Sequence, residues 1–209
     1  PGPLLASTDE MKVVIAGVSS EKNKRVEGLD VLAAAGRAGK PPYEFMRDLI
    51  IEERDRVDAV LFMMSEDNLR RILAHPQVGI GSDSSIRAPY GILASGKPHP
   101  RVYGTFPRVL NKYVRAEHLV SLREMIQKIT SAPAGMFGLA GRGAVREEAF
   151  ADLVVINPET VADRATWSDP HQFPAGIDLV VVNGAVTVRD GEHTGALAGR
   201  VLRKTRTKA

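Results

Sequence analysis

The sequence predicts an α/β protein in which parallel βαβ units are followed by a small antiparallel β unit. Over residues 12–81, short apolar runs alternate with stretches of helical periodicity, a pattern typical of right-handed βαβ units. After about residue 145, strand-like runs follow one another without a helix long enough to cover them. We therefore expect βα units over residues 1–145 and a small β domain with a basic tail over residues 146–209.

In the first region, short runs of apolar and β-branched residues that end in polar turns predict three strands, at residues 12–18, 57–63 and 78–81. Helices are expected at residues 28–38 and 42–54. A further helix should follow Ser65, a typical N-cap residue, and should end at His75-Pro76.

Residues 84–116 are rich in glycine, proline and arginine, which predicts a long loop of the kind that often carries function. An amphipathic helix of three to four turns is expected over residues 119–129, and a short helix should begin near Ser131. Farther on, Asn183-Gly184 between two apolar runs predicts a tight β-hairpin, and Asp190-Gly191 predicts another turn.

The composition excludes several classes of site. Hydrophobic residues make up 44% and charged residues 25%, as in ordinary globular proteins. The chain has no cysteine, so it can form no disulfide, thiolate zinc site or cysteine nucleophile, which fits a cytoplasmic protein. Its apolar runs are far shorter than the ~20 residues of a membrane span. The start shows no signal-peptide pattern, and the lack of an initiator methionine suggests a fragment or a processed chain.

The net charge is +3, and much of the excess lies near the C-terminus, at Arg200, Arg203, Lys204, Arg206 and Lys208. Such a cluster can bind nucleic acid, with an affinity that falls steeply with salt. No aromatic residues are interleaved with it for base stacking. We therefore expect a solvated tail, with neither nucleic acid nor membrane as a partner.

The sharpest candidate for a site is Gly81-Ser82-Asp83, directly after the third predicted strand. Ligands and catalytic groups gather at the carboxyl ends of strands in parallel α/β folds, although the same tripeptide is also a common turn. No two of the five histidines have the spacing of a metal-ligand pair. His99, in the long loop, is the histidine that we consider near a site; the alternative is a loop histidine bonded to backbone.

Five segments carry a resemblance to a known family. They are VGIGSDSS at 78–85, HPRVYGTFPRVL at 99–110, ITSAPAGMFGLAGRG at 129–143, ADLVVINPETVADRATW at 151–167 and GIDLVVVNGAVTVRDGEHTGALAGRVLRK at 176–204. Together they closely resemble the C-terminal part of the N-acyl-D-amino-acid deacylases (D-aminoacylases), in the amidohydrolase superfamily. The ADLVV segment is shared by many amidohydrolases, whereas HPR and YGTF after GSD are more specific to the deacylases.

The resemblance implies the C-terminal portion of a (β/α)₈ metal-dependent hydrolase barrel, followed by part of a composite β-sandwich. Asp83 matches the aspartate that ends the last barrel strand at the metal. In the implied mechanism, a zinc-bound hydroxide attacks the amide of an N-acyl-D-amino acid, and Asp83 passes the water's proton to the leaving amine. Candidate substrate-binding residues are Ser82, Arg87, His99 and Arg101. Either arginine could pair with the substrate carboxylate or be a surface loop charge.

The departures from the family pattern are as informative as the matches. The His-x-His pair of the first barrel strand is absent, and Asp83 alone cannot hold zinc, because catalytic sites need about three protein ligands. We therefore expect a piece of a zinc-dependent deacylase that needs an N-terminal segment or self-association and that neither binds zinc tightly nor hydrolyses amides by itself. The alternative is a non-catalytic fragment or interaction module that retains the fold.

Overall fold

The computed structural model describes residues 12–203 and divides into two compact units, each described by itself. Unit 1 comprises the described chain up to Ser65 with residues 84–103 and 165–172. Unit 2 comprises residues 66–83, residues 104–164 and the described chain from Phe173 onward. The boundary expected near residue 145 lies within unit 2, so that division into domains stays a prediction. Lys204, Arg206 and Lys208 of the basic tail lie outside the described residues.

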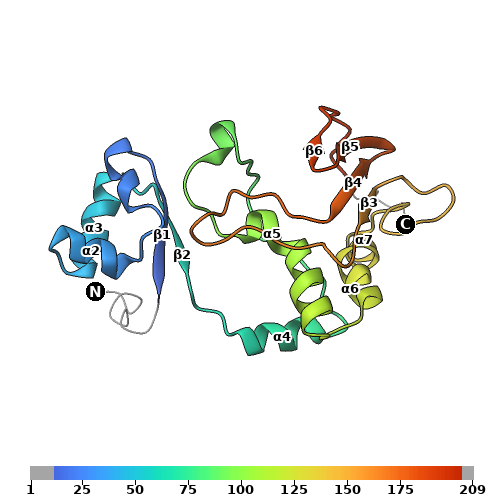
Figure 1. Cartoon of the computed structure of the whole chain (residues 1–209), viewed down its shortest axis with the longest axis horizontal. Coiled ribbons are helices and arrows are strands. Elements are labelled where there is room, and N and C mark those ends of the chain that lie inside the picture. The colour runs from blue at the N-terminus through green and yellow to red at the C-terminus, as the bar shows by residue number, and fades with distance from the viewer. Residues whose placement is uncertain (1–11, 204–209) are drawn as a thin grey trace, which may run out of the picture. The chain divides into compact units, whose positions relative to one another are not determined.

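Unit 1 is built on two paired strands with helices packed against them (Figure 1). The elements are β1 (Val13–Val18), η1 (Glu21–Val26), α2 (Val31–Ala38), α3 (Pro42–Glu52) and β2 (Val57–Leu61). The short 3₁₀-helix η2 (Gly91–Ala94) lies in a later segment. Buried apolar residues from the strand and the helices form the core: Ile15, Val26, Val31, Ala34, Met46 and Leu49.

Local signals fix both α-helices of unit 1 close to the expected residues. The side chain of Asp30 accepts a hydrogen bond of 2.8 Å from the Leu32 amide and caps α2. Gly39 ends this helix in the left-handed conformation, at a φ of 64°. Pro42 occupies the first turn of α3, where its missing N–H has no intrahelical acceptor in any case. The helices expected at 28–38 and 42–54 are confirmed.

The pairing of the two strands differs from the sequence prediction. β1 and β2 run antiparallel, with Val14 opposite Val60, so the parallel units expected for residues 12–18 and 57–63 are wrong. The connection between the strands contains two consecutive α-helices. One helix would return the chain to the edge where β1 began. A second helix brings it back to the edge where β1 ended, so the next strand runs in the opposite direction.

A buried carboxylate closes the turn after β1. Glu53, directly after α3, is 2% exposed. It accepts hydrogen bonds of 2.8 Å from the amides of Ser19 and Ser20, one from the Ser20 hydroxyl and one of 2.7 Å from Asn23 Nδ2. The hydrogen bonds from the Ser20 and Asn23 side chains lower the pKa of Glu53 to about 2.

Unit 2 contains a group of helices and a β-sheet. The helical elements are α4 (Glu66–Ala74), α5 (Arg101–Arg108, from Gly104 on), the π-helical η3 (Val109–Ala116), α6 (Leu122–Ile129) and α7 (Ser131–Phe137). Buried side chains of α4, η3 and α6 form one cluster with Val161, which lies in a loop: Leu73, Val109, Leu110, Tyr113, Met125 and Val161. Among the described residues no helix is long and apolar enough to cross a membrane.

Two helical predictions for unit 2 need correction. The helix expected over residues 119–129 begins at Leu122, because Ser121 and Glu124 form a capping box there. The loop expected over residues 84–116 ends at Arg101, where α5 begins, and the chain is helical from there to Ala116, although Pro107 lies inside α5. Proline removes a backbone donor, and the chain continues past it with the wider turns of a π-helix. Burial of Val109, Leu110 and Tyr113 stabilises this helix.

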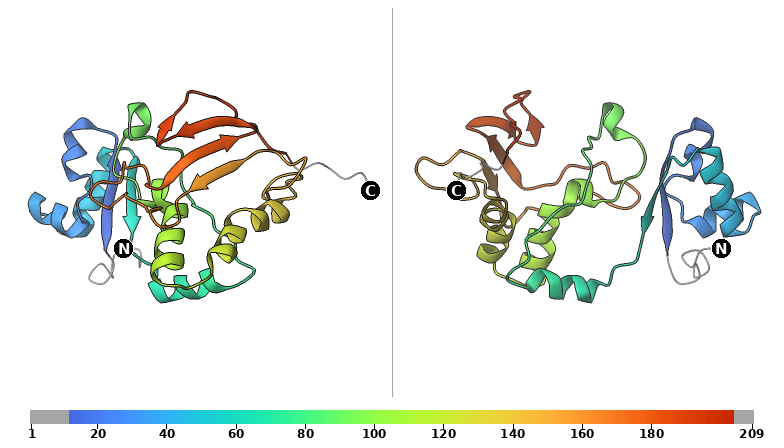
Figure 2. Two further views of the ribbon diagram at one scale, coloured as in Figure 1. Left: turned by 45° about the vertical axis from the view of Figure 1, so that its right-hand side comes forward. Right: turned by 180° about the vertical axis from the view of Figure 1, so that it is seen from behind.

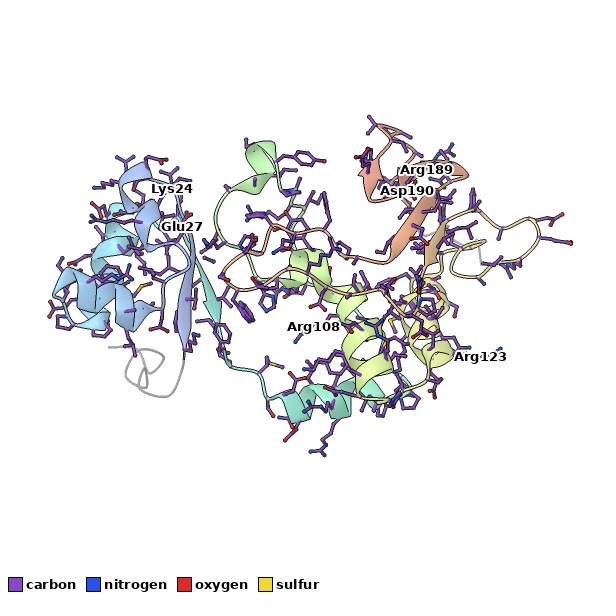
Figure 3. The ribbon with its side chains drawn as sticks, viewed as in Figure 1. Lys24, Glu27, Arg108, Arg123, Arg189 and Asp190 are labelled. Carbon is purple, nitrogen blue, oxygen red and sulfur yellow. The ribbon has the colours of Figure 1, made fainter. Side chains whose placement is uncertain are left out.

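The antiparallel β unit expected after residue 150 is confirmed (Figure 2). Its strands lie in the order β3 (Leu153–Ile156), β4 (Ile177–Val182), β5 (Ala185–Arg189) and β6 (Glu192–His193). The β4–β5 turn is Asn183-Gly184, with φ angles of 48° and 84°, as a type I′ hairpin requires. Asp190 and Gly191 repeat this geometry, with φ angles of 50° and 83°, between β5 and β6 (Figure 3).

We expect acid to unfold unit 1 through Glu53. Because its pKa in the folded state lies below the ordinary 4.5, the carboxylate stabilises the unit above that pH, and the stabilisation is lost as the pH falls towards about 2. Glu53→Gln should lower the melting temperature at neutral pH and reduce its dependence on pH below 4.5. Thermal unfolding followed by circular dichroism between pH 2 and 7 measures both effects.

Glu44→Gln, exposed on α3, is the matched control. An unchanged acid transition in Glu53→Gln would contradict this account.

Candidate active site

The segment that leads to Asp83 is held by a buried lysine of unit 2. Lys128, on α6, is 6% exposed, and its ammonium group donates to the carbonyl oxygens of His75 and Val78, the latter at 3.0 Å. In return, the carbonyl of Lys128 accepts a hydrogen bond of 3.2 Å from the Ile80 amide. The strand that the sequence predicts at residues 78–81 is therefore wrong: these residues form no strand, because their backbone bonds to a helix end instead.

Ser82 and Asp83 end this segment. Ser82 is half-buried and Asp83 is exposed. The backbone of Asp83 has a φ of 48°, in the left-handed region that aspartate adopts more readily than most residues other than glycine. Both residues take part in further interactions within the described structure. The hydrogen bonds to Lys128 thus hold the segment that ends at Asp83, and Asp83 is exposed.

Arg87 joins the start of the loop that follows Asp83 to a later part of the same loop. Its guanidinium donates to Ser85 Oγ, to Ser95 Oγ and to the Ser95 carbonyl oxygen, each at 3.2 Å. A backbone hydrogen bond of 3.5 Å from Ala88 to Leu93 closes the same loop. With its Nε and Nη1 engaged in this way, Arg87 fits the structural alternative better than it fits recognition of a substrate.

His99 and Arg101 lie at the start of α5, in unit 1. Nδ1 of His99 accepts a hydrogen bond of 2.9 Å from the backbone amide of Arg101, the first residue of the helix. The His99 ring also packs edge-on against Trp167, with ring centroids 4.5 Å apart. Nδ1 of His99 is therefore bonded to backbone, and the role of this histidine near a site stays a prediction. The side chain of Arg101 is exposed.

Sequence reasoning missed a second histidine of unit 1. His171 contacts the Gly96 carbonyl oxygen through Nε2 at 2.9 Å and the Tyr103 hydroxyl through Nδ1 at 3.0 Å. Burial raises the pKa of Tyr103, so its hydroxyl keeps its proton and can donate. The sequence offered no local signal for His171, which lies far from Gly96 along the chain and in no recognisable motif.

A network of charges joins α4 to η3 in unit 2. Glu66 accepts hydrogen bonds from Lys112 and, at 2.7 Å, from the Tyr113 hydroxyl, and Arg70 donates to Glu117 at 2.8 Å. Burial and the hydrogen bond to Glu66 raise the pKa of Tyr113 to about 12. At the end of α5, Arg108 (labelled in Figure 3) pairs with Asp163, with Nη1 3.0 Å from Oδ2. These partly buried groups are paired with one another and have a structural role.

Ser82 and Asp83 belong to unit 2, whereas Arg87, His99 and Arg101 belong to unit 1. Within residues 12–203, no group of three or more His, Asp or Glu side chains could hold a metal ion. Two sets of site candidates are thus described, each in its own unit, without a metal-ligand cluster in the described part of the chain.

Comparison with known proteins identifies the family. The Amidohydrolase family model matches residues 29–188. The chain belongs to the amidohydrolase family, in its D-aminoacylase branch. It is 42% identical over 180 residues to a D-aminoacylase of Alcaligenes xylosoxydans xylosoxydans. It is also 41% identical over 146 residues to an N-acyl-D-glutamate deacylase of the same organism.

The amidohydrolase relatives are much longer than the matched segment. The two alignments cover 86% and 70% of this chain but 35% and 28% of the relatives. Among solved structures, a D-aminoacylase matches 91% of this chain at a TM-score of 0.78 and 39% identity, which is 37% of its own length. An N-acyl-D-glutamate deacylase from Bordetella bronchiseptica, complexed with zinc and a phosphonate inhibitor, gives a TM-score of 0.74 at 34% identity over 91% of this chain and 38% of its own.

The matching fold is a mixed α/β segment of D-aminoacylase and does not contain a closed barrel. Within residues 12–203 the strands form one two-stranded and one four-stranded sheet, and both are antiparallel. The four-stranded sheet agrees with the expected β unit. The closed barrel that the family resemblance implies remains a proposal for the complete protein.

We expect Lys128→Met to destabilise unit 2 and to loosen the segment before Asp83. Methionine keeps the length of the side chain but leaves the carbonyls of His75 and Val78 without their donor, at a cost of about 2–3 kcal/mol. Hydrogen exchange of the Ile80 amide should become faster in step with this loss. Arg123→Met, at an exposed position on the same helix (Figure 3), should change the free energy of unfolding by less than about 0.5 kcal/mol. Equal effects of the two substitutions would contradict the anchoring role of Lys128.

Proposed function

We propose that the complete protein hydrolyses the amide bond of N-acyl-D-amino acids to a carboxylate and a free D-amino acid. The observation that carries this proposal is the shared chemistry of its relatives. A D-aminoacylase, an N-acyl-D-glutamate deacylase and an N-acyl-D-aspartate deacylase are 41–43% identical to this chain over 145–180 residues. The last two enzymes are both named for an N-acyl-D-amino acid. They differ in its side chain, which is glutamate in one and aspartate in the other.

In this proposal Asp83 is the proton carrier. Hydrolysis adds water across the amide: the water oxygen bonds to the carbonyl carbon, the C–N bond breaks, and one proton moves to the leaving nitrogen. A carboxylate can accept that proton from water and donate it to the amine. Asp83 is supported in this role by its exposed carboxylate, by its anchored segment and by its match to the family's aspartate.

For the substrate carboxylate we propose Arg101 as the partner, with Ser82 and His99 as further candidates near the substrate. A guanidinium can bind a carboxylate through two parallel hydrogen bonds. The engagement of Arg87 with Ser85 and Ser95 makes it the weaker candidate. Arg101 stands at the first position of α5, a place where the helix dipole also favours negative charge.

Zinc is the metal that we propose for the complete enzyme. Solved relatives include a D-aminoacylase with a binuclear metal centre and an N-acyl-D-glutamate deacylase complexed with zinc. The residues described here do not fit a complete metal site, so no reaction step is assigned to the metal. We propose that the other ligands lie in the part of the protein that corresponds to the unmatched length of the relatives.

The sheet of unit 2 has an exposed apolar edge, which is suited to pairing with a further strand. β3 lies at the edge of the sheet, and Leu153, Val154 and Val155 are between 38% and 57% exposed. An apolar edge strand is a ready site for pairing with another strand. We propose that an N-terminal segment of the complete protein, or a second copy of this chain, covers it.

The alternative function is a non-catalytic interaction module that retains the fold. The observation in its favour is that residues 12–203 contain no metal-ligand cluster. The two functions are separated by assay of the complete protein on N-acetyl-D-amino acids, with the L-enantiomers as the comparison. Turnover that is selective for the D-enantiomer supports the deacylase.

We expect Asp83→Asn in the complete protein to retain the fold and to lower kcat about 100- to 10,000-fold, since a positioned acid–base group contributes about that factor. Steady-state kinetics and circular dichroism measure the two effects. Asp178→Asn, at an exposed position of β4, is the control and should turn over normally. Near wild-type turnover in Asp83→Asn would remove Asp83 from the mechanism.

We also expect the 209-residue chain, purified by itself, to bind well below one zinc ion per molecule and to leave N-acyl-D-amino acids intact. The physical reason is that, within residues 12–203, Asp83 belongs to no group of three His, Asp or Glu side chains that could hold a metal ion, and a catalytic zinc needs about three protein ligands. Metal analysis after dialysis and an amine-release assay measure these properties. A monomer with one tightly bound zinc ion and turnover would show that ligands within this chain had been overlooked.

A further inference from the structure

The connection between β3 and β4 includes residues 165–172, which belong to unit 1 together with residues 84–103. We call residues 165–172 the clamp segment. His171 of this segment contacts Gly96 and Tyr103, which lie on either side of Arg101 in sequence. Since its Nε2 faces a carbonyl oxygen, Nε2 must carry the proton, and Nδ1 is left to accept from the Tyr103 hydroxyl. One imidazole ring therefore ties together both ends of the segment that carries Arg101.

A second contact reaches the middle of the same segment. Trp167 packs against the rings of His99 and Phe62, in each case with ring centroids 4.5 Å apart. His99 in turn accepts the backbone N–H of Arg101 at 2.9 Å. Trp167 thus restricts the ring that holds the first amide of α5.

The backbone at Gly96 is adapted to this arrangement. Its φ is 71°, and a Cβ atom there would lie 2.8 Å from the carbonyl oxygen of Ala16 in β1, so glycine is needed for the close approach. The next residue, Lys97, donates its amide to the same carbonyl at 2.5 Å and its ammonium group to the Ser168 carbonyl at 2.6 Å. Residues 96–97 are therefore held both by β1 and by the clamp segment.

We propose that Trp167 and His171 are positioning residues for Arg101. They hold the backbone at the start of α5, so that the guanidinium is preorganised to pair with the carboxylate of the substrate. The proposal rests on the proposed function and adds to it a specific role for the β3–β4 connection. Preorganisation matters because a residue that is ordered before binding loses less conformational entropy when the substrate arrives.

The first test measures KM and kcat in the complete protein with an N-acetyl-D-amino acid. His171→Ala and Trp167→Ala should each raise KM about tenfold while kcat stays within about threefold, as expected when an interaction common to ground and transition states is weakened. His171→Gln should restore most of the loss, because its amide can donate to Gly96 and accept from Tyr103. His193→Ala is the matched control, since His193 is exposed on β6 and its Nδ1 contacts the amide of Gly195.

The second test asks whether the effect acts through Arg101. In an Arg101→Ala background, His171→Ala should cause no further rise in KM, because coupled residues show non-additive effects. An equal rise in both backgrounds would overturn the proposal, since His171 would then act on stability or on another group. Unchanged KM in His171→Ala and Trp167→Ala would overturn it as well.

An optical readout separates failure of this proposal from failure of the proposed function. Trp167 is the single tryptophan of the 209-residue chain, so the emission of this chain, purified by itself, reports directly on the clamp segment. His99→Ala should change the intensity of this emission and the quenching of Trp167 by iodide. If these changes occur while Trp167→Ala and His171→Ala leave KM at the wild-type value, the clamp segment is structural and the proposal is wrong. A complete wild-type protein without deacylase activity would instead overturn the proposed function, and this inference with it.

Discussion

The ammonium group of Lys128 is buried in unit 2 and must find hydrogen-bond acceptors there, because an unpaired charge in an apolar core is very costly. The carbonyls of His75 and Val78 supply them. This requirement holds the chain after α4 against the end of α6 and sets the point at which Asp83 emerges. The candidate proton carrier therefore depends on a side chain that takes no part in the proposed chemistry.

Unit 1 meets the same requirement with the opposite charge. Glu53 is buried at the end of α3, and amide and hydroxyl donors of the turn after β1 satisfy its carboxylate. In both units a buried ion bonds mainly to groups of a loop, which gives that loop one conformation. Such bonds are worth more as constraints on geometry than as net stability, since desolvation offsets much of their energy.

The arrangement of the arginines shows how a structure separates residues that look alike in sequence. Arg87 and Arg101 lie in the same glycine- and proline-rich stretch and were equal candidates for the substrate carboxylate. Nε and Nη1 of Arg87 donate to the serines of its own loop. Arg101 is exposed at the start of α5, and its backbone is held by His99. Ordering the backbone while the side chain faces solvent is the combination that a binding residue needs.

Local chemistry in the sequence determined the helices capped by Asp30 and by the Ser121–Glu124 pair, the hairpin at Asn183-Gly184, and the motifs that place the chain among the amidohydrolases. Each of these signals acts within a few residues, so it can be recognised without knowing the fold. Tertiary structure alone decided the antiparallel pairing of β1 with β2, the absence of a strand at residues 78–81 and the contacts of His171. These features join residues far apart in sequence, 50 positions for Lys128 with Val78 and 75 for His171 with Gly96. Hydrophobic periodicity shows that a segment will be buried, but the partner that buries it is chosen by the packing of the whole unit.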